Sequence, residues 1–206
     1  MKTLLLAAAA LTVSAAPAMA QIDGLYVQGN LGVVASGEAE FELADQKSRA
    51  MGYQGQFDMD TAAFVSAVVG KSITPKWAVE GEVFYTKPDL SVSGRNADAT
   101  NYGVLVNAKY EAYRNEKYGI YVGAGIGYGS TEYNLAVPDY DYADNADDTG
   151  VIWQLQAGVT YDLSARMAVD FGYRYLNAPE VSAYDALRAD VKADMHVVTA
   201  GLRYKF

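Results

Sequence analysis

His196 is the only histidine in the chain, so any catalysis that needs an imidazole must use it. A catalytic histidine needs a nucleophile or an acidic partner within hydrogen-bond reach. His196 shares the phase of Val198 and Leu202 along its segment, whereas Thr199 points to the opposite face. The spacing pairs no nucleophile with His196, and we predict that the chain is not an enzyme. We interpret His196 as a polar-tipped ring at the edge of an apolar face.

Metal and cofactor chemistry also has little support in the sequence. The chain has no cysteine, which excludes disulfides and thiolate metal sites. The acidic stretch from Asp139 to Asp148 could gather a divalent cation through its carboxylates. It departs from a calcium-binding loop at Ala143 and Asp144, where that motif requires a ligand and a glycine. We predict no metal site and no cofactor.

Alternating glycines at Gly123, Gly125, Gly127 and Gly129 do not form a nucleotide-binding motif, because no helix follows them to receive a pyrophosphate. Glycine inside a strand often marks the close approach of another group. We expect these glycines to make room for long interior side chains. A small lumen beside this segment is the alternative.

Period-two alternation predicts eight strands that would position these groups. They lie near residues 24–34, 59–70, 77–87, 101–112, 119–129, 150–162, 167–176 and 194–206. Their length of about ten residues is what a tilted strand needs to cross a bilayer. The connections after the second, fourth and sixth strands are short, whereas those near 35–58, 88–100, 130–149 and 177–193 are long. Short turns at one rim and long loops at the other are typical of outer-membrane barrels.

One face of these strands carries aliphatic residues, among them Leu25 and Val27, with aromatic rings near the strand ends. Such a face suits contact with lipid. We expect an aromatic girdle of Trp77, Tyr85, Tyr102, Tyr110, Tyr128, Trp153, Tyr161, Tyr173 and Tyr175. The second strand is ambiguous, because residues 62–69 are mostly apolar on both faces.

The fold prediction is therefore an all-β chain, an eight-stranded antiparallel up-and-down transmembrane β-barrel. A soluble barrel of the lipocalin kind, with its apolar face turned inward around a ligand, is the alternative.

The opposite face of the strands is polar and would line the barrel interior. The predicted interior polar network is Glu80, Glu82, Lys109, Glu111, Asp170, Arg174, Arg203 and Lys205. An eight-stranded barrel is just wide enough for side chains to fill, so we expect a plugged interior rather than an open channel. Neighbouring antiparallel strands should bring Asp170 and Arg203 level, and we predict an ion pair between them.

The first twenty residues have the features of a secretory signal peptide. Lys2 precedes a short apolar stretch, and Ala18-Met19-Ala20 is a cleavage site of the A-x-A type. We expect cleavage after Ala20, which leaves one barrel domain over residues 21–206. No later stretch is apolar and long enough for a membrane-spanning helix. The expected location is the bacterial outer membrane.

Four segments resemble small outer-membrane barrels, the porin-family group related to OmpX and to the barrel of outer-membrane protein A. They are GLYVQGNLG at 24–32, YVGAGIGY at 121–128, DFGYRY at 170–175 and AGLRYKF at 200–206. The resemblance implies that Tyr204 and Phe206 help the barrel-assembly machinery recognise the last strand, with periplasmic chaperones as further partners. We expect no peptidoglycan-binding domain, because the chain stops at its eighth strand.

The chain is acidic, with a formal net charge of -9, and its acidic residues are concentrated in the long loops. This charge argues against nucleic acid as a partner. We expect contact with outer-membrane lipid and lipopolysaccharide, and with a host or cell-surface ligand through the acidic loops. A structural or surface-exposed role, antigen-like or adhesion-like, is favoured, and a narrow porin or conduit for small solutes is the alternative.

Overall fold

The computed structural model describes residues 23–43, 55–58, 61–87, 89–92, 95–136, 143–177, 181–183 and 189–206. The predicted signal peptide, the cleavage position after Ala20 and residues 137–142 of the acidic loop lie outside these ranges. No helix in the described part of the chain is long and apolar enough to cross a membrane.

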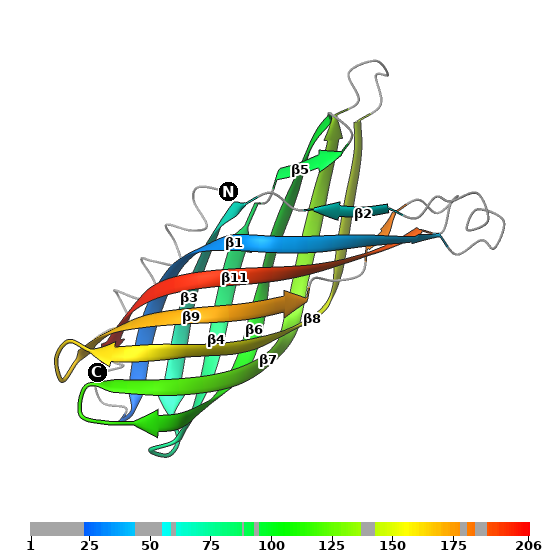
Figure 1. Cartoon of the computed structure of the whole chain (residues 1–206). Helices are drawn as coiled ribbons and strands as arrows, with labels where there is room; N and C mark the ends of the chain where they lie inside the picture. Colours follow the sequence, from blue (N-terminus) through cyan, green and yellow to red (C-terminus); the bar gives the residue numbers. More distant parts are fainter. Residues whose placement is uncertain are drawn as a thin grey trace.

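Eight long strands of the described residues form an antiparallel sheet that closes on itself through the pairing of the first with the last (Figure 1). They are β1 (Leu25–Leu43), β3 (Ala62–Ser72), β4 (Trp77–Thr86), β6 (Arg95–Arg114), β7 (Tyr118–Ala136), β8 (Ala143–Asp162), β9 (Met167–Asn177) and β11 (Ala189–Lys205). Each long strand pairs with the long strands before and after it in sequence. The predicted up-and-down barrel is confirmed.

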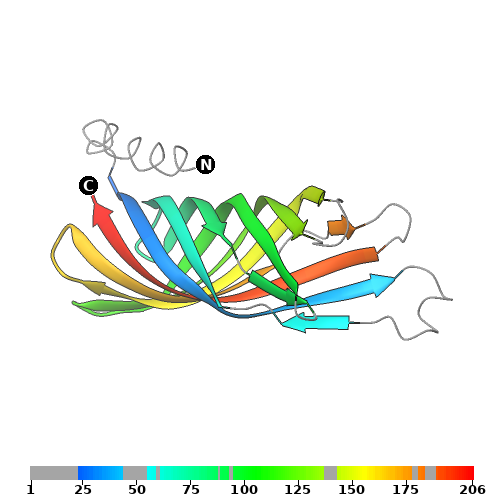
Figure 2. The same ribbon diagram turned by 90° about the horizontal axis from the view of Figure 1, so that it is seen from above.

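Three short strands are added to this barrel. They are β2 (Gly55–Asp58), β5 (Asp89–Val92) and β10 (Val181–Ala183), which pair with β1, β6 and β11 respectively. The long strands curve together around the interior, and the short ones lie where the long strands extend past their neighbours (Figure 2).

One end of the barrel, which we call the turn end, carries the three short connections at residues 73–76, 115–117 and 163–166. A side-chain oxygen organises each turn by accepting a backbone N–H three residues later. Thr74 accepts from Trp77 at 3.0 Å, Asn115 from Tyr118 at 2.8 Å and Ser164 from Met167 at 3.0 Å. Side chains of these types stabilise turns in this way, which explains why the predicted short connections lie here.

The opposite end, the loop end, differs from the sequence prediction because several strands are longer than expected. The β7–β8 pairing continues to Ala136 opposite Ala143, and the β1–β11 pairing continues to Leu43 opposite Ala189. Segments expected as loops at 35–43, 95–100, 130–136, 143–149 and 189–193 are therefore strand. Backbone pairing requires no apolar alternation, so these polar segments gave no strand signal. They project beyond β3, β4 and β9 (Figure 1).

Burial alternates along the strands, with apolar side chains outside and most polar ones inside. Leu31, Val106, Ile126 and Phe171 are 70%, 61%, 62% and 59% exposed at the barrel surface. A water-soluble protein rarely exposes so many large apolar side chains, and a membrane-spanning barrel presents them to lipid. The lipocalin-like alternative, in which this face would point inward, is therefore wrong.

This alternation resolves which face of β3 points inward, and it corrects the expected position of Leu25. On the ambiguous second strand, now β3, Phe64 and Val68 point inward while Ala63 and Val69 are exposed. Leu25 was expected on the lipid face but is buried. It lies at the turn end, where its carbonyl oxygen accepts the Phe206 N–H at 3.1 Å and its side chain borders a cavity.

Candidate functional site in the barrel interior

The aromatic residues predicted as a girdle lie on the outer surface at two levels. Trp77, Tyr110 and Tyr161 are near the turn end, and Tyr85, Tyr102, Tyr128, Trp153, Tyr173 and Tyr175 are nearer the loop end. Trp77 packs on Tyr110 with ring centroids 4.9 Å apart, and Trp153 packs on Tyr175 at 5.3 Å. At a rise of about 3.3 Å per residue and a tilt of about 40°, Trp77 and Tyr85 lie roughly 20 Å apart along the barrel axis. That separation is close to the height of the apolar band of an outer-membrane barrel.

His196 belongs to this outer surface and is surrounded by aromatic rings. The Tyr173 hydroxyl hydrogen-bonds with its Nδ1 at 2.5 Å, and the Tyr175 ring packs edge-on with a centroid distance of 5.4 Å. Thr199 is buried on the other face, where its hydroxyl donates to the Gly172 carbonyl oxygen at 3.4 Å. The interior is therefore the better candidate for a functional site.

The inward-facing residues change from polar and charged to apolar along the barrel axis, and the inward positions of β4 show this change. From the turn end, its inward positions are Ala78 beside a cavity, Glu80, Glu82, Phe84 and Thr86. β6 runs the opposite way and repeats this order, with Lys109, Asn107 and Leu105 at successive inward positions. The interior is thus built of layers, and neighbouring strands contribute to each layer.

The layer nearest the cavity is a charged quartet of Glu80, Lys109, Asp170 and Arg203. Lys109 Nζ lies 3.4 Å from Glu80 Oε1 and 3.9 Å from Asp170 Oδ2. Arg203 Nη2 lies 3.4 Å from Asp170 Oδ2 and 4.0 Å from Glu80 Oε1. Each cation thus faces both carboxylates, and the Asp170–Arg203 contact is the one that the sequence analysis expected.

Two buried tyrosines that the sequence analysis missed support the quartet. Tyr26 donates to Glu80 Oε1 at 2.6 Å, and Tyr121 donates to Asp170 Oδ1 at 2.7 Å. The cations lie over the same rings, with Lys109 Nζ 3.7 Å from the Tyr121 centroid and Arg203 Cζ 4.5 Å from that of Tyr26. Such placement adds cation–π attraction to the ion pairs.

Inward-facing glycines leave the space that these tyrosine rings occupy. A Cβ atom at Gly70 would overlap the Tyr26 ring, and one at Gly172 would lie 2.9 Å from the Tyr121 hydroxyl. Their positions could have revealed these tyrosines, because on a β-strand Tyr26 points to the same face as Gln28, and Tyr121 to the same face as Gly123.

The space beside the run of glycines on β7 is also occupied by side chains of a neighbouring strand. A Cβ atom at Gly123 would lie 3.0 Å from Gln156 Cγ, and one at Gly129 would lie 3.1 Å from Ile152 Cγ2. These are closer than ordinary contacts, so the glycines accommodate side chains of β8 as expected. Gly123, Gly125, Gly127 and Gly129 do not line the cavity at the turn end.

The next layer is a polar network around the Glu82 carboxylate. Arg174 contacts Glu82 Oε1, while the amide groups of Asn107 and Gln154 each donate to Glu82 Oε2 at 2.9 Å. Gln154 also donates to Asn107 Oδ1 at 2.7 Å. Within the described interior the buried charges are Glu80, Glu82 and Asp170 against Lys109, Arg174 and Arg203, so they balance.

Glu111 and Lys205, predicted as members of the interior network, lie instead at the turn-end rim. Glu111 pairs with Arg114 at 2.8 Å, and Arg114 also contacts Asp162 at 2.8 Å. Lys205 Nζ lies 2.6 Å from Asp162 Oδ1. All four are partly exposed, because inward positions so close to a strand end meet solvent.

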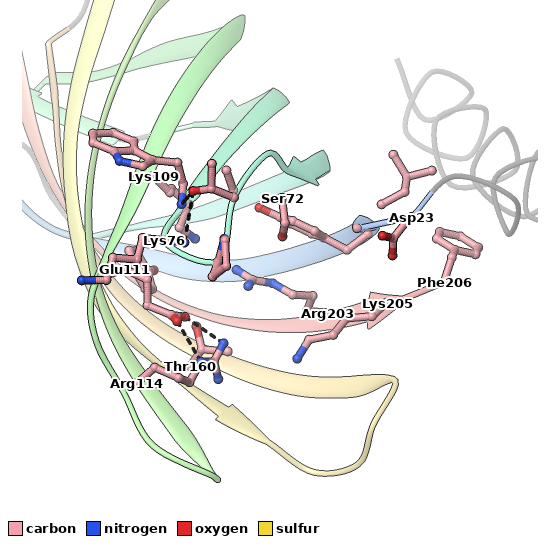
Figure 3. A pocket seen from close by; sticks show the side chains of 18 of the residues that line it. Asp23, Ser72, Lys76, Lys109, Glu111, Arg114, Thr160, Arg203, Lys205 and Phe206 are labelled. Atoms are coloured by element: carbon pink, nitrogen blue, oxygen red, sulfur yellow. Dashed lines mark hydrogen bonds and ion pairs between the residues drawn. The ribbon is translucent and has the colours of Figure 1, made fainter.

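A cavity of about 470 Å³ opens at the turn end (Figure 3). Lys109 and Arg203 of the quartet border its inner end, and Lys76, Arg114 and Lys205 border it nearer the rim. Its volume falls within the range of small-molecule sites. No cluster of three or more His, Asp or Glu residues suited to a metal ion occurs in the described part of the chain.

On the loop side of the Glu82 network the described interior contains an apolar layer, which the sequence analysis did not predict. This apolar layer consists of Val34, Ala62, Phe64, Phe84, Leu105, Ile152, Leu176, Met195 and Val197. Within it, Phe64 of β3 and Phe84 of β4 stack with ring centroids 5.9 Å apart. A void of about 10 Å³ bordered by Phe84, Ile152, Leu176 and Met195 has room for about one water molecule. The expectation of a polar interior thus fails at this layer, and buried polar residues such as Thr86, Asn101 and Thr131 follow nearer the loop end.

Comparison with known proteins gives one family and several relatives. The family model described as outer membrane protein beta-barrel domain matches residues 5–206. An uncharacterized protein of Brucella suis biovar 1 (strain 1330) is 24% identical over 177 residues, which cover 72% of this chain and 62% of that protein. The chain therefore spans about three fifths of the length of this curated relative.

Solved structures share the fold at low sequence identity. Neisserial surface protein A (NspA) is similar with a TM-score of 0.56 and 19% identity, covering 89% of this chain and 98% of that one. The outer membrane protein OprG from Pseudomonas aeruginosa has a TM-score of 0.53 and 17% identity, covering 88% and 95%. Both likenesses concern the fold alone.

Proposed function

The chain belongs to the outer membrane protein β-barrel family, and on that premise we propose that it is a plugged barrel with a structural or surface-exposed role in the bacterial outer membrane. In such barrels short turns face the periplasm and longer loops face outward. The turn end is accordingly the periplasmic end, and the loop end is the extracellular one.

The filled interior is the observation that carries this proposal. Side chains of the charged quartet and the Glu82 network cross the lumen and neutralise one another, and the apolar layer continues the filling toward the loop end. An eight-stranded barrel has just enough interior for such packing. These layers support a barrel that does not conduct ions.

The extended strands support display at the cell surface. The β6, β7 and β8 extensions and those of β1 and β11 project beyond β3, β4 and β9, and they carry acidic residues such as Asp98, Asp147 and Asp190. We propose that these acidic segments meet lipopolysaccharide and a host or cell-surface ligand, and that the protein has no catalytic role. The name of Neisserial surface protein A is in keeping with such a role.

Export and assembly form a second part of the proposal. Cleavage after Ala20 would release the barrel into the periplasm, where chaperones and the barrel-assembly machinery would receive it. Tyr204 and Phe206, whose ring centroids lie 5.2 Å apart at the end of β11, would serve as the assembly signal.

A narrow conduit for small solutes is the second candidate, and the periplasmic cavity favours it because solutes could enter the barrel partway. Single-channel recording of the refolded protein in a planar lipid bilayer tests both. We expect no conductance steps. Discrete steps in the wild-type protein would overturn the plugged barrel and favour the conduit.

A further inference from the structure

We infer that the apolar layer, rather than the charged quartet, is the barrier that closes this barrel, so that small polar solutes reach the quartet from the periplasm alone. This inference rests on the proposed plugged barrel and identifies the part of the interior that closes it.

The first step of the argument is that the quartet is already open to one side. Lys109 and Arg203 belong to the quartet and also border the cavity of about 470 Å³. Figure 3 shows both side chains reaching into the space that opens at the turn end. Water and small solutes that fill the cavity therefore meet the quartet directly.

The second step is that the apolar layer completes a ring around the barrel. Seven of the eight long strands of the described barrel contribute at least one of its side chains, and β7 contributes Gly129, over which Ile152 packs. Phe64, Ile152, Leu176, Met195, Val34 and Val197 are each less than 2% exposed. The void beside them has room for about one water molecule, and we infer that this layer interrupts the water of the interior.

The third step compares the two layers as obstacles to an ion. The quartet presents charges of both signs that can replace part of an ion's hydration shell. An apolar constriction presents no such groups, so an ion must lose its water without compensation, and pores are closed by dewetting in this way. Loss of the ion pairs should enlarge the periplasmic cavity without connecting it to the other side.

Conductance of two double variants separates these roles. Phe64→Ser with Phe84→Ser replaces the two stacked rings of the apolar layer, whereas Asp170→Asn with Arg203→Gln removes two quartet charges and keeps the net charge. We expect conductance steps from the first variant and none from the second. The matched control is Tyr128→Ser with Phe171→Ser, which removes two rings from the outer surface and should stay silent.

A cysteine placed in the cavity tests the one-sided access, because the chain has no cysteine of its own. Ala78 borders the cavity, and Ala78→Cys should react with a charged, membrane-impermeant thiosulfonate reagent from the turn end only. The assay uses vesicles in which protease cleavage of the loops reports the direction of insertion. With the two phenylalanine substitutions added, we expect the reagent to reach the thiol from the loop end as well.

Each outcome decides between the proposals. Steps in the wild-type protein would defeat the plugged barrel itself. A silent wild type with steps in the quartet variant would leave the plugged barrel standing and overturn the apolar barrier. So would a silent phenylalanine variant that migrates as a folded barrel, or an Ala78→Cys thiol that does not react from the turn end.

Discussion

Replacement of Arg174 by methionine removes the cation that neutralises Glu82 and keeps an unbranched side chain in its place. Glu82 would retain the amide donors of Asn107 and Gln154, but its carboxylate would lose the cation that contacts it. Arg174 and Glu82 have side chains only 4% and 1% exposed, so water cannot compensate for the loss. Removal of one partner from a buried ion pair costs about 3–5 kcal/mol.

This cost should appear as a large shift in urea unfolding of the barrel in lipid vesicles, followed by the fluorescence of Trp77 and Trp153. With a denaturant slope of about 2 kcal/mol/M, the midpoint should fall by about 2 M. Addition of Glu82→Gln removes the unpaired charge, and we expect the double variant to recover much of the loss. Buried ion pairs can often be replaced by neutral groups at little cost.

Arg114→Met is the matched control, because Arg114 is likewise an ion-paired arginine, with two carboxylate partners, but its side chain is 33% exposed at the rim. A pair in contact with solvent is worth about 1 kcal/mol or less. Equal midpoint shifts for Arg174→Met and Arg114→Met, or no recovery in the double variant, would refute the view that burial of charge dominates here.

Two further predictions concern interior space and assembly. Gly70→Ala should lower the free energy of unfolding by about 1–3 kcal/mol, because the added methyl group overlaps the Tyr26 ring, and Tyr26→Leu in the same chain should relieve the overlap in a double-mutant cycle. Deletion of Phe206 should reduce the amount of barrel found in the outer membrane of cells while leaving refolding of the purified protein into detergent intact, and equal amounts in cells would contradict its role as an assembly signal.

The barrel itself could be predicted because a lipid-facing strand must alternate. Val151, Trp153 and Leu155 face outward while Ile152, Gln154 and Gln156 face inward, and this alternation marks β8 in the sequence. The strand extensions could not be predicted in the same way. Residues 143–149 lie beyond the apolar band, where backbone pairing alone forms the strand.

The layering of the interior escaped prediction for a different reason. Phe84 and Leu105 point inward, as Glu82 and Asn107 do. The sequence of a single β-strand does not show which residues of other strands its inward side chains will contact in the lumen. The Asp170–Arg203 contact could be anticipated because both charges lie on adjacent strands, β9 and β11. The hydrogen bonds of Tyr26 and Tyr121 each pass over one intervening strand, β3 and β8 respectively, and local sequence spacing does not reveal such contacts.

The position of Arg203 on the final strand also has a consequence for the order of folding. Its guanidinium contacts Gln28 on β1, Glu80 on β4 and Asp170 on β9, so it joins the two ends of the chain to the middle. Until β11 closes against β1, the half-built barrel carries Glu80 and Asp170 without one of their two cations. The last strand thus completes both the wall and the charge balance, and closure is a long-range step of the kind that slows folding. A barrel in which β11 has not yet paired with β1 would leave Glu80 and Asp170 accessible to water, and closure of that seam would remove this water from the quartet.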